Sequence, residues 1–313
     1  MTDAGTVAVT DHPFRDLDIE RFLLEPRGYR LAERQCSSAD EVAEACAEAV
    51  GLLNTYAPMP AEVIERLGRC RAIARYGVGL DTIDLDAAEA RQIRVSNVPD
   101  YCVEEVALHA IALLLAAHRR VVRGSRLVRN GSWGALAAGP VHRLEGRLLG
   151  LVGCGRIPRS VAAKARGLGL RVAAHDPYVA DEDWPDGIER YADLGELAAA
   201  ADFLSVHAPL TDETRHLVDD ELLRRMPAHA VLVNTARGPL VDTEALNRAL
   251  TEGRIGGAAL DVLESEPPPP GLPLLRHDDV IVTAHQAFYS EEALRELQRK
   301  AAQNLLEALE ATP

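Results

Sequence analysis

The chain has 313 residues, which is long for a single hydrophobic core and fits two domains. Its hydrophobic content of 47% and charged content of 26% are ordinary for a globular protein in water. The net charge of −14 argues against nucleic acid as a partner, because a phosphate backbone needs a positive face, but it leaves an anionic small molecule open.

The cysteines and the apolar runs limit the class of protein further. The five cysteines are odd in number and none form a C-x-x-C pair, so neither disulfides nor a metal site is predicted. The N-terminal segment lacks a signal pattern, and the longest apolar run, residues 106–117, is too short to span a bilayer. We therefore expect a cytoplasmic protein with reduced thiols and no membrane partner.

Short apolar runs alternate with helical patterns along the chain. In the first hundred residues the predicted strands are 6–10, 51–54, 72–77 and 93–98, and the helices between them are 41–50, 61–68 and 84–92. A helix is then predicted over 102–120, and the later strands are 147–153, 170–176, 202–209, 230–236, 256–262 and 279–285. Such alternation is typical of βαβ units on parallel sheets.

The C-terminal segment 290–310 has the pattern of a helix with Ser290 as its N-cap. We therefore predict an α/β fold of two Rossmann-like or flavodoxin-like domains with parallel sheets, one inserted into the other. The outer domain would comprise residues 1–98 and 290–313, and the inserted domain residues 99–289.

A glycine-rich turn stands at mid-chain. Gly153 allows a tight turn, and Gly155 lets the backbone approach a pyrophosphate, whose charge then faces the N-terminus of the next helix. The nearest donors are the N–H groups of Arg156 and Ile157. Pro158 replaces a third glycine, but proline is tolerated in a first helical turn. The pattern by itself also fits a tight turn without a ligand.

Asp176 indicates which dinucleotide the turn would bind. It closes the next predicted strand, 21 residues after Gly155. A carboxylate at this place accepts hydrogen bonds from both ribose hydroxyls and repels a 2′-phosphate. We therefore expect NAD as the cofactor and expect NADP to be disfavoured.

Several stretches together resemble one family. They are "YGVGLDTIDLDAA" (76–88), "VSNVPDYCVEEVALH" (95–109), "VNTARGPLVDTEAL" (233–246), "GAALDVLESEPP" (257–268) and "TAHQAFYS" (283–290). With the glycine turn, they are similar to D-isomer-specific 2-hydroxyacid dehydrogenases, most of all to the branch related to the C-terminal binding proteins. The resemblance implies that 99–289 is the NAD-binding Rossmann domain and that 1–98 with 290–313 is the substrate-binding (catalytic) domain. It also implies a homodimer built on the cofactor domain.

The resemblance places the catalytic residues in three motifs. The arginine of N-T-A-R-G matches Arg237, the second glutamate of E-x-E-P matches Glu266, and the histidine after the last strand matches His285. Arg237 offers a fork of donors that can bind the carboxylate of a 2-oxo acid and polarise its carbonyl. His285 can protonate the developing alkoxide, while Glu266 stabilises the imidazolium.

The resemblance also implies cofactor and substrate contacts. Asp261 matches the aspartate that holds the nicotinamide carboxamide, and Arg237 and His285 stand beside the cofactor. The other residues of the cofactor crevice are His207, Ala208, Pro209, Thr235 and Ala236. The backbone N–H groups of Val78 and Gly79 match the loop that receives the substrate carboxylate. We add four candidates for the wall of the substrate pocket: Asn54, Tyr76, Tyr101 and Phe288.

These motifs predict an NAD-dependent oxidoreductase that interconverts a small D-2-hydroxy acid and its 2-oxo acid by hydride transfer. They leave open which acid is turned over and in which direction. An alternative of another class is an NAD(H)-sensing, co-repressor-like scaffold with little or no turnover. A homologue that binds NAD without turning anything over is a third possibility.

Overall fold

The structure is a computed structural model that describes residues 4–311. The chain forms two compact units: unit 1 is Met1–Cys102 with Tyr289–Pro313, and unit 2 is Val103–Phe288. Unit 2 is therefore inserted into unit 1, and both carry parallel sheets, which confirms the predicted fold class. The sequence placed the limits after residues 98 and 289, whereas the units divide after Cys102 and Phe288.

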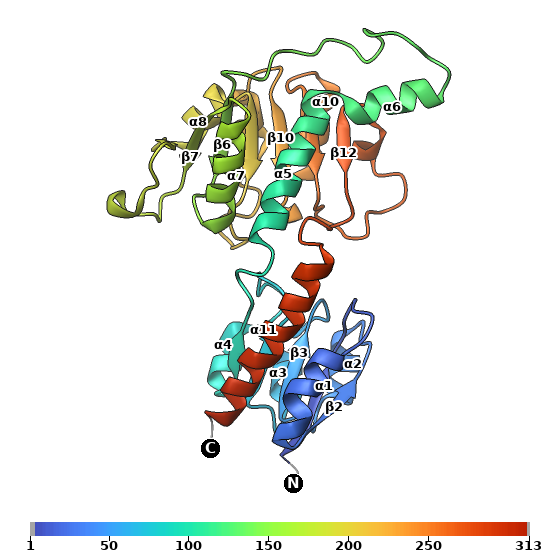
Figure 1. The fold of residues 1–313 in the computed structure, drawn as a ribbon, viewed down its shortest axis with the longest axis vertical. Coiled ribbons are helices and arrows are strands. Elements are labelled where there is room, and N and C mark those ends of the chain that lie inside the picture. The colour runs from blue at the N-terminus through green and yellow to red at the C-terminus, as the bar shows by residue number, and fades with distance from the viewer. Residues whose placement is uncertain (1–3, 312–313) are drawn as a thin grey trace. The chain divides into compact units, whose positions relative to one another are not determined.

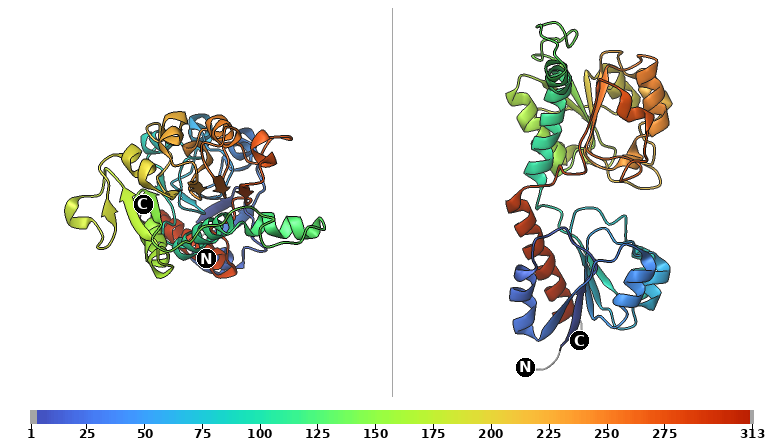
Figure 2. Two further views of the ribbon diagram at one scale, coloured as in Figure 1. Left: turned by 90° about the horizontal axis from the view of Figure 1, so that it is seen from above. Right: turned by 90° about the vertical axis from the view of Figure 1, so that its right-hand side faces the viewer.

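Unit 1 is built on a five-stranded parallel sheet of order β2-β1-β3-β4-β5. Its strands are β1 (Gly5–Val9), β2 (Tyr29–Glu33), β3 (Gly51–Asn54), β4 (Ala72–Arg75) and β5 (Arg94–Ser96). Its helices are α1 (Asp18–Leu24), the short η1 (Glu25–Arg27), α2 (Ala39–Ala45), α3 (Ala61–Arg66), α4 (Leu85–Ala90) and α11 (Glu291–Glu310). Helices α1 and α11 cover one face of the sheet, and α2 to α4 cover the other (Figure 2).

Helix α11 returns the end of the chain to unit 1. As predicted, Ser290 is its N-cap, because the Ser290 side chain accepts a hydrogen bond from the N–H of Ala293 at 2.9 Å. The buried stripe that includes Leu297, Ala301 and Leu305 packs on α1, β3 and β4. The last helix is thus part of the core of unit 1.

Unit 2 is built on a seven-stranded parallel sheet of order β12-β11-β10-β9-β6-β7-β8. Its strands are β6 (Leu148–Val152), β7 (Arg171–His175), β8 (Glu189–Arg190), β9 (Phe203–Val206), β10 (Val231–Asn234), β11 (Gly257–Leu260) and β12 (Val280–Val282). Its α-helices are α5 (Val103–His118), α6 (Val121–Arg129), α7 (Arg156–Gly167), α8 (Leu194–Ala200), α9 (Asp220–Arg225) and α10 (Thr243–Thr251). Its short 3₁₀ helices are η2 (Asp181–Asp183), η3 (Gly238–Leu240) and η4 (Pro273–Arg276).

The order of strands in unit 2 reverses beside β6. From β6 the chain runs outward through β7 and β8 and then returns to β9 on the other side. Helices α5 and α7 cover one face of this sheet, while α8, α9 and α10 cover the other (Figures 1 and 2). In such sheets, ligands bind outside the carboxyl ends of the strands at the reversal.

Helix α5 ends earlier than the sequence predicted. It stops at His118, and Arg120 takes a left-handed backbone conformation (φ 53°) before α6 begins. Helix α6 extends beyond the sheet of unit 2 (Figure 1), and Val121, Val122 and Val128 on it are exposed. No helix within residues 4–311 is both long and apolar enough to cross a membrane.

Candidate active site

The glycine-rich turn joins β6 to α7. Gly153 has a φ of +101°, and a Cβ on it would lie 3.2 Å from the carbonyl oxygen of His207, so the turn lies against the loop after β9. A Cβ on Gly155 would meet nothing within 4 Å, so the space beside it is open. Helix α7 starts without a side-chain cap, which leaves its first N–H groups, including those of Arg156 and Ile157, for an anion. Pro158 is buried in the first turn of α7 and does not break it. This geometry fits a pyrophosphate.

Asp176 follows β7 directly and is held by the glycine turn. Its Oδ2 accepts a hydrogen bond from the N–H of Cys154 at 2.8 Å, and its Oδ1 accepts one from the N–H of Tyr178 at 2.9 Å. A carboxylate oxygen has two lone pairs, so each oxygen can still accept a bond from a ribose hydroxyl. The side chain is half-buried and therefore accessible.

The loops after β9 and β10 carry the other predicted cofactor contacts. His207 bonds through Nε2 to the hydroxyl of Ser205 at 2.8 Å, and burial lowers the pKa of its imidazole to about 4, so the ring is neutral. Ala208 and Pro209 follow it. The Oγ1 of Thr235, beside Ala236, is buried and has no partner among residues 4–311. A buried hydroxyl without a partner is costly, which favours a ligand at this place.

The loop that carries Arg237 is shaped by two neighbours in its motif. Buried Asn234 donates to the carbonyl of Arg237 at 2.8 Å and accepts from the N–H of Ala236 at 3.0 Å. A Cβ on Gly238 would lie 2.0 Å from the carbonyl oxygen of Leu263, so only glycine permits this approach. The arginine loop therefore lies directly against the loop after β11.

Glu266, on the loop after β11, meets His285, on the loop after β12. Nδ1 of His285 lies 2.7 Å from Oε2 of Glu266, and Oε1 accepts from the N–H of Leu263 at 2.9 Å. The side chains of His285 and Glu266 are 33% and 37% exposed, so both can reach a ligand. Burial raises the pKa of Glu266, but the bonds from His285 and Leu263 and the charge of Arg237 together hold it below its usual value. The structure thus gathers the arginine, the glutamate and the histidine in one place.

The backbone of His285 is left-handed (φ 48°), which is uncommon for a residue with a side chain. Asp261 holds this turn: its carbonyl accepts from the N–H of His285 at 2.8 Å, and its carboxylate accepts from the N–H groups of Gln286 and Ala287 at 3.0 and 2.8 Å. The hydroxyl of Thr283 also donates to the carboxylate. Burial would raise the pKa of Asp261, but the bonds from His109, Thr283 and the backbone lower it to about 2.

A second histidine–glutamate pair lies on the same loop as Glu266. Nε2 of His216 lies 2.6 Å from Oε1 of Glu264, and Oε2 of Glu264 accepts from the N–H of Thr243 at the start of α10. Glu264 therefore ties the loop to neighbouring segments, while Glu266, two residues later, faces His285. The two glutamates of the motif have separate partners.

Val78 and Gly79 lie in a loop of unit 1. The carbonyl of Gly77 accepts from the N–H of Val98 at 3.0 Å, and the carbonyl of Val78 accepts from the amide of Asn97. Within residues 4–311, the N–H groups of Val78 and Gly79 have no hydrogen-bond partner. Two adjacent free N–H groups fit a carboxylate.

Three candidates for the substrate pocket are buried. Tyr76 is 2% exposed and its hydroxyl donates to Oε1 of Glu20 at 2.7 Å, while Asn54 donates to Thr10 and to the carbonyl of Ala57. Tyr101 is also buried. These side chains offer little surface to a ligand, and their place in the wall of the pocket stays a prediction from the sequence. Phe288, in unit 2, is half-buried with its ring edge-on to the ring of His285, centroids 6.3 Å apart.

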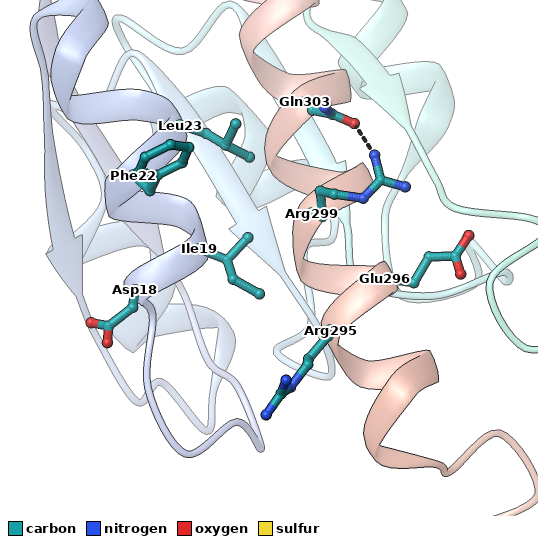
Figure 3. A pocket seen from close by; sticks show the side chains of 8 residues that line it. All are labelled: Asp18, Ile19, Phe22, Leu23, Arg295, Glu296, Arg299 and Gln303. Atoms are coloured by element: carbon teal, nitrogen blue, oxygen red, sulfur yellow. Dashed lines mark hydrogen bonds between the residues drawn. The ribbon is translucent and has the colours of Figure 1, made fainter.

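A groove of about 760 Å³ lies elsewhere, between α1 and α11 of unit 1 (Figure 3). Exposed Phe22 lines one side, and Arg295 and Arg299 line the other. No predicted site residue lines it, so it is not part of the candidate active site.

Sequence reasoning missed Asn234, Gly238, His109 and Thr283. The first two belong to a quoted motif, where a polar residue ends an otherwise apolar strand and a glycine follows the arginine. His109 stands on the apolar stripe of a predicted helix, which was the available signal. Thr283 opens the quoted stretch 283–290, but its role depends on a partner that is distant in the chain.

A glycine turn at a strand-order reversal, together with an arginine and a glutamate-paired histidine on nearby loops, defines a dinucleotide-dependent dehydrogenase. The family model for the D-isomer specific 2-hydroxyacid dehydrogenase NAD binding domain matches residues 111–287. The chain is 44% identical over 267 residues to a glyoxylate reductase of Korarchaeum cryptofilum, covering 83% of this chain and 79% of that protein. The chain therefore belongs to the D-isomer-specific 2-hydroxyacid dehydrogenase family.

Solved structures of other oxidoreductases have a similar fold. A D-lactate dehydrogenase from Aquifex aeolicus, complexed with NAD and lactic acid, has a TM-score of 0.86 and 27% identity, covering 97% of this chain and 98% of that one. An acyclic imino acid reductase in complex with NADPH and D-Arg has a TM-score of 0.88 and 25% identity, covering 98% and 97%. The matched family domain binds NAD, but the second complex holds NADPH, so the preference against NADP stays a prediction from Asp176.

The two glycines of the turn should respond differently to alanine. Gly155→Ala is expected to leave thermal stability nearly unchanged but to weaken NADH binding by about tenfold or more, because its Cβ occupies the open space beside the helix N-terminus. Gly153→Ala, the control, should lower stability by roughly 1–2 kcal/mol because of its positive φ. NADH fluorescence titration and thermal unfolding measure both effects. Unchanged NADH affinity in Gly155→Ala would contradict the assignment.

Proposed function

We propose that the protein is an NAD-dependent D-2-hydroxyacid dehydrogenase that interconverts a small D-2-hydroxy acid and its 2-oxo acid. The observation that carries the proposal is the 2.7 Å contact between His285 and Glu266, with the charge of Arg237 acting on the same carboxylate. Membership in the family and the similarity to a glyoxylate reductase support it.

The proposed roles follow from donor chemistry. Bound NADH supplies the hydride. Arg237 binds the substrate carboxylate with its fork of N–H donors and polarises the carbonyl. Because Nδ1 of His285 faces Glu266, Nε2 is the nitrogen that gives its proton to the alkoxide oxygen. Ionised Glu266 stabilises the imidazolium before the transfer, and in the oxidation direction Nε2 takes the proton back.

Two further contacts are proposed for the ligands. The free N–H groups of Val78 and Gly79 are suited to a carboxylate of the substrate, and half-buried Phe288 to the wall beside His285. For the cofactor, Oδ2 of Asp261 accepts one hydrogen bond and keeps capacity for a carboxamide N–H. Asp176 would bind the ribose hydroxyls, so NADP is disfavoured.

The scaffold alternative gains no support from the site. A protein that only sensed the dinucleotide would not need a carboxylate placed on the histidine beside an arginine. The relatives described above are enzymes by name.

We also propose that the protein is a cytoplasmic homodimer. Trp133 and Leu136, in the loop after α6, are 90% and 86% exposed, and the valines of α6 are exposed too. Such an apolar surface on an element that extends beyond its unit favours a second copy as the partner. The five cysteines are free and buried, which fits a reducing compartment.

The proton transfer can be tested with a matched pair of histidines. The wild type should consume NADH with at least one acid from a panel of glyoxylate, hydroxypyruvate, branched-chain and aromatic oxo acids. His285→Ala should lower kcat about 10²–10⁴-fold, because the general acid is lost. His216→Ala, which removes the neighbouring histidine paired with Glu264, should keep kcat nearly unchanged. Equal losses in both variants, or no turnover by the wild type, would refute the mechanism.

The cofactor preference can be tested at Asp176. Asp176→Asn keeps an acceptor but removes the negative charge, so the ratio of kcat/KM for NADPH over NADH should rise by about tenfold or more. Asp181→Ala, which removes a fully exposed carboxylate nearby, should leave the ratio unchanged. Steady-state kinetics with both dinucleotides measure the ratio. An unchanged ratio in Asp176→Asn would show that this carboxylate does not select the cofactor.

The dimer can be tested by sedimentation. The wild type should sediment at about twice the 33.9 kDa of one chain. The double variant Trp133→Glu/Leu136→Glu should sediment as a monomer, because charges replace the exposed apolar surface. Phe22→Glu, which charges an exposed aromatic of unit 1, should remain dimeric. A monomeric wild type, or a dimeric double variant, would contradict the proposal.

A further inference from the structure

His109, the last residue of the quoted stretch 95–109, contacts the loop of His285 from helix α5. Its Nε2 lies 3.0 Å from Oγ1 of Thr283 and 3.4 Å from Oδ1 of Asp261. The helix that carries it, α5, packs against β10, β11 and β12. The imidazole therefore reaches the two residues on which the turn after β12 depends.

The orientation of α5 makes this contact specific. His109 lies three residues after Val106 and four before Leu113, which are both buried, so it belongs to the stripe that faces the sheet. Its neighbour Leu108 is exposed, while the side chain of His109 is 21% exposed. An apolar residue thus faces water and an imidazole faces the sheet, which costs free energy unless the imidazole is hydrogen-bonded.

The hydrogen-bond inventory fixes the tautomer of His109. The single hydroxyl proton of Thr283 goes to the carboxylate of Asp261, so Oγ1 of Thr283 can only accept from His109. Ionised Asp261 also can only accept. Nε2 of His109 must therefore carry a proton and donate.

We propose that His109 is a positioning residue for His285. It donates to Thr283 and lies 3.4 Å from the carboxylate of Asp261, and Asp261 in turn accepts from the N–H groups of residues 285–287. These bonds keep His285 in a left-handed backbone conformation that is strained for a residue with a side chain and would otherwise relax. The effect on catalysis rests on the proposed function, whereas the effect on the turn does not.

The turn can be followed in the protein without cofactor. His109→Leu should raise amide exchange at Gln286 and Ala287 about tenfold, because the carboxylate that accepts their N–H groups loses a donor. His109→Gln, which keeps an N–H donor, should restore most of the protection. Leu114→Ala, a cavity in the same helix, should lower global stability without a selective increase in this segment. Exchange in His109→Leu that matches the wild type would overturn the proposal.

The kinetic arm uses a double-mutant cycle. His109→Leu and Thr283→Val should each lower kcat about tenfold at saturating substrates, and the double variant should lose little more, because both belong to one network. His109→Gln should recover most of kcat, and Leu114→Ala should stay close to the wild type. The positioning role would be overturned if the kcat losses of the two single variants multiplied in the double variant. It would also be overturned if His109→Leu had the kcat of the wild type. If the wild type turned over no oxo acid, the proposed function would fail, and the exchange result would still decide the role of His109.

Discussion

Loops at the carboxyl edge of the unit 2 sheet approach one another so closely that glycine is required at their contacts. Gly153 brings the turn after β6 against the loop after β9, and Gly238 brings the arginine loop against the loop after β11. These approaches bring loops from well-separated parts of the chain together. Without them, the loop of Arg237 and the loop of Glu266 would not lie against each other.

The carboxylates of the site are each held by several donors. Burial alone would favour the neutral acid at Asp261 and Glu266, but the hydrogen bonds outweigh it and lower both pKa values. The pKa of Asp261 is about 2 in the folded protein, below its ordinary value of about 3.9. The ionised carboxylate therefore stabilises the fold at any pH above about 3.9. That contribution is lost as the pH falls toward 2. The hydrogen bonds of the Asp261 carboxylate thus contribute both to the stability of the fold and to the backbone conformation at His285.

Much of the secondary structure could be predicted, and the failures have physical causes. Strand 51–54 and the Ser290 cap match the structure, because buried strands and N-caps have local signals. Helix α1 was not predicted, since one of its two buried positions is taken by Glu20 and an exposed position by Phe22, which disturbs the usual pattern. Strand β2 was missed because it lies at a sheet edge, partly exposed, without a long apolar run.

The amino-acid sequence by itself determined the alternation of strands and helices, the glycine turn and the types of residue available for hydride-transfer chemistry. These follow from torsional preferences and periodicity, which act over a few residues. The tertiary structure alone decided partners: Glu266 bonds to His285 and Glu264 to His216, and His109 reaches Asp261 across the sheet edge. Such pairings depend on where distant segments come to lie once apolar surfaces are buried. Patterns over a few residues do not predict these long-range contacts.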